Sequence, residues 1–551
     1  MGNHRHHRQL GLVDQAGLEA LRLALTGDAN LIVATLAQVK QLGACARDQG
    51  GHVQVNPSRS NEIETSSHAW QLPAVNLQPM RIPLHFAKMG MGDLFPDIHV
   101  IWKNQAIDRK AIHLHLRGPG NLFDEQPDAD LHLTVWNGRA ILSSSALEMA
   151  PETKHHPTLI DNAVEVASCA VALQHVLAMA GLLRDTRVTD RWLSLSLRVD
   201  GVPPEAAVDM FESSLGSASA SLLPDGTGSL VRIRLPLDET TPEILRMVEH
   251  PCAEPAKLGS DDWISLSPIS VEVVDGKVIN SEITLPSELD EANVVVLGVG
   301  GLGSWAAPLF ACGVNAAGLN MTLVDADDTV EAHNLNRQVL YRAKDIGGPK
   351  ALMAEIRLRQ LLGKLPQITG IHTRLESNHV HPQEEVHDFA GISLADLVGG
   401  EDENGVQLTE SLSKMDVGLA CLDNMNSRSL LNRSCLNHGA IFVNGGSESF
   451  EGLVELLEPG VCMVCRYGEE AAKSRERISC QEVGARPVAS IVTTTAWTGA
   501  MQAAIALLAL CESRGLLSGD WNRGLEFDCG HVHPRPIGRL PWIEPDCEVH
   551  L

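Results

Sequence analysis

The sequence predicts an α/β protein whose C-terminal half forms a doubly wound, mostly parallel sheet. From about residue 293 onward, short apolar runs typical of strands alternate with longer runs of helical periodicity. A glycine-rich turn over Gly298–Gly303 follows the first of these strands and opens a helix. Hydrophobic residues make up 44% and charged residues 20% of the 551, a globular composition that excludes a rod or a wholly disordered chain.

The C-terminal half is expected to alternate strands and helices in a regular order. Strands are predicted at 294–297, 321–324, 370–373 and 418–422, and helices at 304–312 and 350–362. The apolar stretch 496–511 is short and carries Gln502, so it predicts a buried helix rather than a membrane span. A polar, acidic stretch at about 379–413 interrupts the alternation and indicates a surface insertion.

The N-terminal half mixes both periodicities and has no glycine-rich loop. Helices are predicted at 13–25, 31–42 and 164–183, and strands at 98–102, 111–116, 131–136, 140–144, 193–199 and 230–235. Asn137-Gly138, between two of these strands, is a strong hairpin signal. The Pro- and acid-containing segment 281–291 indicates the domain boundary, which gives domains 1–285 and 286–551.

Charge and cysteine content narrow the possible functions. Lys and Arg number 43 and Asp and Glu 69, so the net charge is −26, which argues against a general binder of nucleic acid or anionic membranes. Twelve cysteines are too few for a disulfide scaffold, which favours intracellular thiols with metal or catalytic roles. The first ten residues are polar and basic with no apolar stretch behind them, so we expect no secretory signal and a cytoplasmic location.

The glycine-rich turn predicts a nucleotide-binding loop. Its glycines, which let the backbone approach a phosphate at a helix N-terminus, are Gly298, Gly300, Gly301 and Gly303. Alone, this pattern is also typical of a dinucleotide-binding dehydrogenase. An acidic side chain about 20 positions further on is expected to bind the ribose hydroxyls, and Asp325 and Asp327 are the candidates.

The next residues along the chain are not those of a dehydrogenase but those that a triphosphate requires. An Arg, a Lys and an Asn are expected to converge on the phosphates, and the segments that supply them contain Asn334, Arg337, Gln338, Lys350 and Asn424. The family resemblance described next implies the phosphate role of Gln338. Asp423, at the end of the fourth strand, is the carboxylate expected to hold Mg²⁺.

These motifs resemble the adenylation domain of the ubiquitin-activating enzyme superfamily, which includes sulfur-carrier adenylyltransferases and bacterial ubiquitin-like activating enzymes. The resemblance covers about residues 293–551 and implies that the glycine-rich loop, Arg337 and Lys350 bind ATP while Asp423 binds Mg²⁺. It also implies that the C-terminal carboxylate of a ubiquitin-like protein attacks the α-phosphate of ATP. The segment after the second strand is one residue longer than usual in the family, so Asp325 and Asp327 both remain candidates for the ribose.

The first residues carry a second part of the resemblance. The segment from Arg5 to Gln9 is similar to the Arg-aromatic-x-Arg-Gln opening of the superfamily, with His6 in place of the aromatic residue. There an arginine reaches the ATP of the other half of a dimer or pseudo-dimer, and Arg8 matches it. Residues 1–285 are then expected to be a degenerate, inactive adenylation-like domain that completes the active one, within an internal pseudo-dimer or a homodimer.

The cysteines predict a structural zinc site. Cys462 and Cys465 form a C-x₂-C pair, and Cys547 and His550 form a C-x₂-H pair at the end of the sequence. The superfamily has the same two-pair arrangement, normally with four cysteines. The segment Cys529–His533, which contains Cys-x-His-x-His, is the rival for the second pair.

Cys480 is the candidate nucleophile. The resemblance implies that a cysteine in this segment accepts the activated carboxyl as a thioester, and Arg486 together with a nearby helix N-terminus is expected to favour its thiolate. The first functional hypothesis is therefore an activating enzyme that hands a ubiquitin-like protein to a conjugating enzyme, in a bacterial and potentially antiviral system. The alternatives are a sulfur-carrier adenylyltransferase without conjugation and an inactive scaffold that only binds a ubiquitin-like protein.

Overall fold

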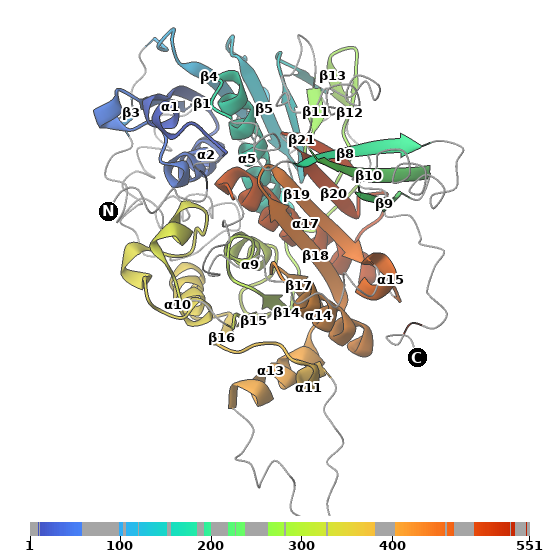
Figure 1. Ribbon diagram of the computed structural model, residues 1–551. Coiled ribbons are helices and arrows are strands. Elements are labelled where there is room, and N and C mark those ends of the chain that lie inside the picture. Colours follow the sequence, from blue (N-terminus) through green and yellow to red (C-terminus); the bar gives the residue numbers. More distant parts are fainter. Residues whose placement is uncertain are drawn as a thin grey trace, which may run out of the picture.

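The structure is a computed structural model of the 551-residue chain. It describes residues 9, 12–57, 99–102, 106–118, 121–150, 156–183, 192–199, 219–225, 228–236, 263–279, 283–326, 329–380, 403–457, 460–467, 490–528, 530–534 and 547. The predicted α/β class is confirmed, with helices packed against two large sheets (Figure 1).

The C-terminal half is built on an eight-stranded sheet of order β16-β15-β14-β17-β18-β19-β20-β21. Its strands are β14 (Ala292–Leu297), β15 (Leu319–Val324), β16 (Gln367–Ile371), β17 (Val417–Ala420), β18 (Ile441–Glu448), β19 (Glu451–Leu457), β20 (Gly524–Asp528) and β21 (His531–Pro534). The first five strands in this order are parallel and the remaining three are antiparallel. This is the doubly wound, mostly parallel sheet that the alternation predicted.

Helices cover both faces of this sheet. They are α9 (Gly303–Ala311), α10 (Lys350–Leu362), α11 (Ser377–Val380), α13 (Glu403–Lys414), α14 (Met425–His438), α15 (Met463–Tyr467) and α17 (Val492–Ser513). α9 and α17 share the larger hydrophobic core, whereas α13 and α14 contribute Leu408, Leu412 and Leu431 to a second core on the opposite face. α17 is long and apolar enough to span a membrane by length and composition, but it is buried in the protein, as its sequence predicted.

The N-terminal half contains a seven-stranded sheet of order β11-β6-β5-β4-β1-β2-β3. Its strands are β1 (Arg22–Gly27), β2 (His52–Pro57), β3 (Val100–Trp102), β4 (Ile112–Arg117), β5 (Leu131–Trp136), β6 (Arg139–Ser143) and β11 (Trp263–Ser265). β3, β2, β1, β4 and β5 are parallel, and β6 and β11 are antiparallel. Among the described residues, the α-helices of this half are α1 (Gln15–Ala20), α2 (Ala29–Leu42) and α5 (Asp161–Met179).

The two halves have the same topology. The order β3-β2-β1-β4-β5-β6-β11 matches β16-β15-β14-β17-β18-β19-β20 strand for strand, and in each half the last two strands of these runs are antiparallel. The equivalent hairpins even share a left-handed residue at the turn, with φ of 46° at Asn137 and 51° at Ser449. Each hairpin is followed by one long buried helix, α5 or α17. The sequence revealed no internal repeat, so this relationship is visible only in the structure.

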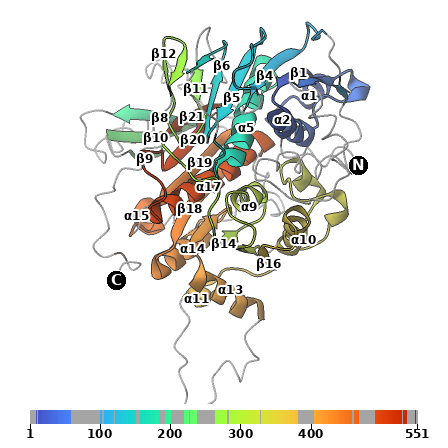
Figure 2. The ribbon, with the colours of Figure 1, turned by 180° about the vertical axis from the view of Figure 1, so that it is seen from behind.

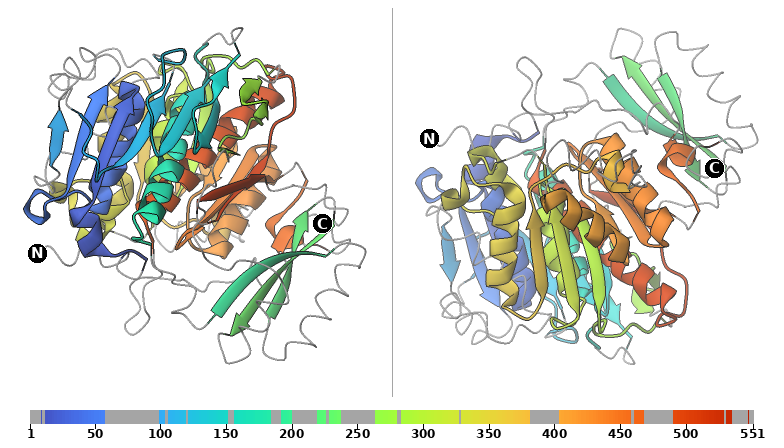
Figure 3. Two further views of the ribbon diagram at one scale, coloured as in Figure 1. Left: turned by 90° about the horizontal axis from the view of Figure 1, so that it is seen from above. Right: turned by 90° about the horizontal axis from the view of Figure 1, so that it is seen from below.

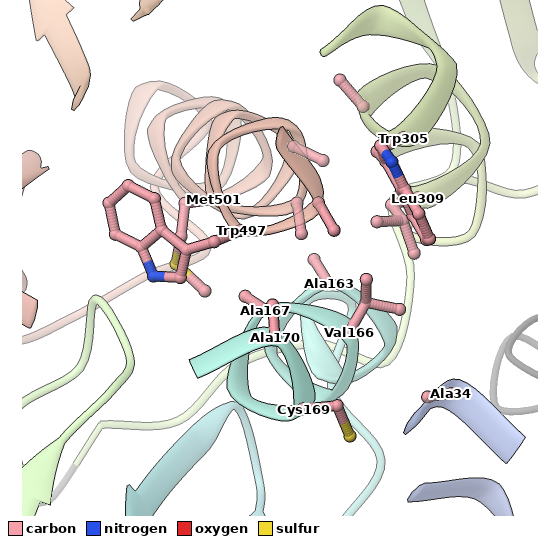
Figure 4. Packing of buried hydrophobic residues seen from close by; sticks show 14 of the residues in the cluster. Ala34, Ala163, Val166, Ala167, Cys169, Ala170, Trp305, Leu309, Trp497 and Met501 are labelled. Carbon is pink, nitrogen blue, oxygen red and sulfur yellow. The ribbon is translucent and has the colours of Figure 1, made fainter. Parts of the chain in front are cut away.

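The equivalent helices α5 and α17 pack against each other and join the halves into one core. Both lie in the middle of the molecule (Figures 1 and 2). Small side chains on α5, including Ala163, Ala167 and Ala170, face α17 and allow the two helices to approach, next to Trp497 and Met501 (Figure 4). The cluster of buried residues is continuous through both halves. An apolar interface of this kind is typical of a permanent pairing.

One connection differs strongly between the halves. Residues 514–523 link α17 to β20, whereas residues 180–262 separate α5 from β11. The longer segment includes a small antiparallel sheet of order β8-β10-β9, with β8 (Trp192–Val199), β9 (Ser219–Asp225) and β10 (Gly228–Pro236). This sheet projects away from both large sheets (Figure 3). β7 (Glu148–Met149), β12 (Glu272–Val274) and β13 (Lys277–Ile279) form a further small sheet.

Some predicted elements need correction. The helix predicted at 13–25 is wrong beyond Ala20, because residues 22–27 form the central strand β1. A strand buried on both faces is as continuously apolar as a buried helix, so periodicity could not separate them. The strand predicted at 370–373 lies at 367–371, and the helix predicted at 164–183 ends at Met179, close to Gly181 with φ of +67°.

The predicted surface insertion is also too long. Residues 403–413 belong to helix α13, and its Leu408 and Leu412 are buried in the second core. Residues 377–380 likewise form α11, which carries the buried Val380. Polar residues on the exposed side of α13 made the segment resemble a loop. The central part, 381–402, lies outside the described residues.

Candidate functional site

The glycine-rich turn connects β14 to α9 at the carboxyl edge of the C-terminal sheet. Gly298 has φ of +90°, and a Cβ there would lie 2.8 Å from the carbonyl oxygen of Cys421 on the neighbouring strand connection. A Cβ at Gly303 would lie 2.0 Å from the carbonyl oxygen of Gly298. Both positions therefore require glycine for steric reasons. The turn brings the N-terminus of α9 to the edge of the sheet, and no side chain caps this end of the helix among the described residues.

Asp325 lies at the end of β15 and supports this turn. Its Oδ2 accepts a hydrogen bond from the backbone N–H of Val299 at 2.9 Å. The carboxyl ends of neighbouring parallel strands meet at one edge, which brings an acidic side chain from one strand to the loop of the next. Asp327, the alternative ribose ligand, lies outside the described residues.

Arg337 is buried and held by neighbouring backbone and side-chain groups. It directly follows the 3₁₀ helix η4 (Ala332–Asn336). Its Nη1 donates to the carbonyl oxygen of His333 and to Oδ1 of Asn336, both at 2.9 Å. Trp305 on α9 donates from its indole Nε1 to the carbonyl oxygen of Arg337 at 2.9 Å. These bonds connect the arginine to the helix that begins at the glycine-rich turn.

Arg337 and Gln338 both flank that turn. A Cβ added at Gly301 would lie 3.8 Å from Nε of Arg337, and one at Gly300 would lie 3.7 Å from Nε2 of Gln338. Both side chains are buried, and Oε1 of Gln338 accepts no hydrogen bond within the part of the chain that the structure describes. A guanidinium and an amide are thus directed at the region where the helix N-terminus could bind an anion.

Lys350 begins α10 and is mostly buried. The hydroxyl of Tyr341 ties this helix to the glycine-rich turn, because it lies 2.6 Å from the carbonyl oxygen of Val299 and 3.2 Å from that of Lys350. Burial raises the pKa of Tyr341 well above its ordinary value, so it remains a neutral hydroxyl. Tyr341 was not predictable from the sequence, because a lone tyrosine belongs to no recognisable motif.

Two amides assigned to the phosphates serve as helix caps in this structure. Oδ1 of Asn334 accepts from the backbone N–H of Glu331 at 2.9 Å as part of a capping box. Oδ1 of Asn424 accepts from the backbone N–H of Ser427 at 3.0 Å and caps α14. Asn334 is buried within η4, which leads directly to Arg337. These two residues therefore shape the elements around the loop.

Asp423 lies exposed at the end of β17, on the same edge of the sheet. Arg428, on the next helical turn, holds this connection by donating from Nε to the carbonyl oxygen of Leu422 at 2.8 Å. Its Nη1 reaches Oδ1 of Asn444 on β18 at 3.3 Å. Arg428 was missed at the sequence level, although its spacing of four residues from Asn424 placed it on the same helix face.

The N-terminal half has an aspartate where the C-terminal half has the glycine-rich turn. Asp28 follows β1 directly, and its Oδ1 accepts from the backbone N–H groups of Asn30 at 2.9 Å and Leu31 at 3.3 Å. A Cβ at Gly118 would lie 2.7 Å from the carboxyl carbon of Asp28, so this turn is closely packed. The N-terminus of α2 is thus occupied by a carboxylate, which disfavours a phosphate there.

The N-terminal segment reaches across to the C-terminal site. Arg8 lies outside the described residues, but its neighbour Gln9 is described and fully buried. Oε1 of Gln9 accepts from Nδ2 of Asn336 at 3.4 Å, across 327 positions of sequence. The residue next to Arg8 therefore contacts the residue next to Arg337.

Three of the four predicted zinc ligands come together. The sulfur atoms of Cys462, Cys465 and Cys547 all lie within 4.8 Å of one another, with 3.5 Å between those of Cys462 and Cys547. His550 lies outside the described residues. In the rival segment, His531 is directed elsewhere, with its ring centroid 6.5 Å from that of His175 on α5. Cys529 also lies outside the described residues.

The predicted nucleophile, Cys480, lies outside the described residues as well. Other cysteines of the C-terminal half are buried, among them Cys421 and Cys511. Burial raises the pKa of Cys421 to about 12 and that of Cys511 to about 11, so both are neutral thiols near pH 7.

Comparison with known sequences gives a consistent set of relatives. The chain matches the model of the ThiF family over residues 282–527. It is 27% identical over 223 residues to the sulfur carrier protein ThiS adenylyltransferase of Escherichia coli, which is 40% of this chain and 75% of that protein. It is 30% identical over 260 residues to the SAMP-activating enzyme E1 of Haloferax volcanii, covering 47% of this chain and 80% of the relative.

Two further similarities were found. The sulfur carrier protein adenylyltransferase of Thermus thermophilus is 31% identical over 229 residues, which is 40% of this chain and 70% of that protein. Among solved structures, E. coli MccB with AMPCPP and MccA is 18% identical with a TM-score of 0.32. That similarity spans 45% of this chain and 65% of the MccB chain.

Proposed function

This chain belongs to the ThiF family, within the ubiquitin-activating enzyme superfamily, and from that premise we propose that it uses ATP to adenylate the C-terminal carboxylate of a ubiquitin-like protein. The observation that carries the proposal is the arrangement around the glycine-rich turn. Buried Arg337 and Gln338 flank that turn, and the hydroxyl of Tyr341 links it to the start of α10 at Lys350.

The residues present fit a bound nucleoside triphosphate. Gly298 and Gly303 leave no room for a Cβ, and no side chain caps the N-terminus of α9 among the described residues. In the reaction, a carboxylate oxygen of the partner forms a bond to the α-phosphorus while the bond from that phosphorus to pyrophosphate breaks. Arg337 and Lys350 stabilise the negative charge that develops on the phosphate oxygens. The rest of the acceleration comes from fixing the two reactants in the productive geometry.

Two metal ions are proposed to assist. Asp423 is an exposed carboxylate at the end of β17, and it suits Mg²⁺, which would neutralise phosphate charge when bound. The three clustered thiols of Cys462, Cys465 and Cys547 suit a tetrahedral zinc ion with His550 as the fourth ligand. A zinc ion there would fasten the end of the chain to α15.

We further propose that Cys480 accepts the activated carboxyl. Its thiolate would attack the acyl carbonyl, forming a thioester as AMP leaves, and a conjugating enzyme would then receive the partner by exchange onto its own thiol. The fused N-terminal half, which shares one core with the C-terminal half, supports a pseudo-dimeric activating enzyme in which Arg8 completes the site. A cytoplasmic location and a role in bacterial defence remain predictions from the sequence.

A second candidate is adenylation of a sulfur-carrier protein without a thioester or conjugation. The names of two relatives, which act on the carrier ThiS and on a sulfur carrier protein, favour it. Both candidates share the adenylation step and differ in the fate of the acyl adenylate. The scaffold hypothesis is the least supported, because a protein that only binds has no physical need for a buried arginine beside a glycine-rich turn.

ATP–pyrophosphate exchange tests the proposed function. The purified chain with its ubiquitin-like partner is expected to exchange labelled pyrophosphate into ATP, and Lys350→Ala is expected to lower the exchange about a hundredfold because it removes a cation beside the phosphates. Lys364→Ala, which changes an exposed lysine just after α10, is the matched control. Equal exchange in the Lys350 variant and the control would disprove the assignment of the site.

A further inference from the structure

We propose that Gln9 and Asn336 are positioning residues for Arg337, so that the N-terminal half fixes the arginine of the C-terminal site through a chain of side-chain hydrogen bonds. The proposal deepens the function proposed above and rests on it. Its starting point is the direct contact between Gln9 and Asn336, two fully buried amides that lie far apart in the sequence.

The orientation of the Gln9 amide is fixed by its partners. Nε2 donates to the carbonyl oxygen of Leu42 and to Oε1 of Gln15, both at 2.9 Å. Because a carbonyl oxygen can only accept, the NH₂ group must face Leu42. Oε1 of Gln9 therefore faces the other way, toward Asn336, as an acceptor.

The orientation of Asn336 is fixed by the same reasoning. Nη1 of Arg337 lies 2.9 Å from Oδ1 of Asn336, and a guanidinium can only donate, so the carbonyl end of the amide must face the arginine. Nδ2 of Asn336 is then left to donate to Gln9 at 3.4 Å. The chain of donation runs in one direction, from Arg337 through Asn336 and Gln9 to Leu42.

This series of hydrogen bonds ends at the C-terminal end of a helix, which favours a cation at the other end of the series. Leu42 is the last residue of α2, a helix of 14 residues whose C-terminal carbonyl groups have no partners within the helix. The C-terminal end of a helix carries partial negative charge, so it polarises the two amides in the sense that favours a positive guanidinium at the other end. The N-terminal half, which has no glycine-rich turn of its own, would contribute to the reaction in this way.

The expected role is to hold the guanidinium of Arg337 in one position. Its Nη1 bonds to His333 and Asn336 fix the group beside Gly301. If residue 9 cannot accept this hydrogen bond, Nδ2 of Asn336 is left buried without its partner. The cost of that unsatisfied donor favours rotation of the amide away from Arg337. Misplacement of a charge-stabilising group by about 1 Å can cost about a hundredfold in rate. We therefore expect a loss of about ten- to a hundredfold in kcat, with a smaller change in KM for ATP.

Gln9→Met is the primary variant, because methionine has a similar shape and cannot accept the hydrogen bond from Asn336. Gln15→Met is its matched control. Gln15 also hydrogen-bonds Gln9 and the carbonyl oxygen of Leu42, and its third partner is Glu19 in the same half. Steady-state pyrophosphate exchange, ATP affinity by calorimetry and thermal unfolding are measured for each variant. We expect Gln9→Met to lower kcat about tenfold or more below Gln15→Met at a similar melting temperature.

Asn336→Asp and Asn336→Leu provide the second comparison if Gln9→Met is too unstable to measure. The aspartate keeps an acceptor for Arg337 and loses the donor to Gln9, whereas the leucine loses both groups. Asn336→Asp is expected to retain more exchange than Asn336→Leu, and the double variant Gln9→Met/Asn336→Leu is expected to be no slower than Asn336→Leu alone.

The outcomes separate the two proposals. If the unmodified protein shows normal exchange, the proposed function stands. Equal kcat in Gln9→Met and Gln15→Met, or additive losses in the double variant, would then overturn the positioning role alone. Absence of both ATP binding and exchange in the unmodified protein would overturn the proposed function together with the role that rests on it.

Discussion

Arg466 and Glu455 form an ion pair that is shielded from solvent. Nη2 and Nε of Arg466 donate to Oε2 of Glu455 at 2.8 and 3.1 Å, and the exposed fractions of the two side chains are 1% and 0%. Glu455 lies on β19, whereas Arg466 lies on α15, next to Cys465. Tyr467 and Asn444 also donate to this carboxylate. The pair therefore anchors the predicted zinc-binding segment to the sheet.

Loss of the cation from this pair is expected to be costly. Arg466→Met leaves the Glu455 carboxylate buried without its opposite charge, which typically costs about 3–5 kcal/mol of unfolding free energy. Urea unfolding measures the change. Arg523→Met is the matched control, because its pair with Glu512 is even shorter at 2.6 Å but more than a third exposed on both sides, and such pairs contribute at most about 1 kcal/mol. Equal losses in the two variants would contradict the anchoring role.

Zinc content provides a second prediction. The purified chain is expected to hold about one zinc ion, because three thiols already lie within ligand distance of one another and structural zinc sites take four ligands. Cys547→Ser and His550→Ala are each expected to lower zinc content as measured by mass spectrometry. Cys435→Ala, a buried thiol in the second core, is the control and is expected to retain the metal. Full zinc content in the Cys547 variant would rule out the assignment.

The thioester can be tested separately from adenylation. Cys480→Ala is expected to abolish a thiol-sensitive adduct with the ubiquitin-like partner while pyrophosphate exchange persists, because exchange requires only the first step. Gel electrophoresis with and without reductant detects the adduct. If no adduct forms with the unmodified protein although exchange is normal, the sulfur-carrier candidate is favoured. An adduct that survives in the variant would show that another residue is the acceptor.

The pH dependence of stability is expected to depend on Asp161, at the start of α5. Burial raises its pKa to about 6, against the opposing effect of hydrogen bonds from Thr158 and Gly138. In the unfolded chain an aspartate titrates near about 3.9. The folded state therefore keeps the proton of Asp161 to higher pH than the unfolded chain does. The proton stabilises the folded state below about pH 4, and this stabilisation is lost as the pH rises through about 6.

Asp161→Asn is the variant that isolates this effect. At about 1.4 kcal/mol per pKa unit, the unmodified protein should lose about 3 kcal/mol relative to the variant from below about pH 3 to above about pH 7, and about 2 kcal/mol of this between pH 4 and pH 6. Denaturant unfolding of both proteins at several pH values gives the difference curve. Buried histidines have the opposite effect on stability over the same pH range, because burial lowers the pKa of His132 to about 4. Both proteins contain these histidines, so their effect cancels in the difference curve. A flat difference curve would contradict the prediction.

Local features of the site were predictable because they depend on neighbouring residues. Gly298 and Gly303 are required by a turn that admits no Cβ, and such steric demands leave a short pattern in the sequence. Asn137-Gly138 forms the expected hairpin, with φ of 46° and 70°, for the same reason. The burial of α17 followed from its mostly apolar sequence, in which Gln502 argued against a membrane span.

Features that depend on distant contacts were not predictable. β1 was mistaken for helix because a central strand and a buried helix are equally apolar. The shared topology of the two halves left no repeat in the sequence, since sheet order constrains the burial of side chains and not their identity. Tyr341 and Arg428 gain their roles from backbone carbonyls that the fold brings to them.

The sequence by itself determined that the C-terminal half carries a glycine-rich turn between a strand and a helix and that the N-terminal half does not. Only the tertiary structure decided how the halves cooperate: Asp28 occupies the helix N-terminus equivalent to that loop, α5 packs on α17, and Gln9 meets Asn336 beside Arg337. The physical reason is the range of the interactions. Backbone sterics and helix starts are encoded within a few residues, whereas a hydrogen bond across 327 positions exists only once two sheets have folded and packed.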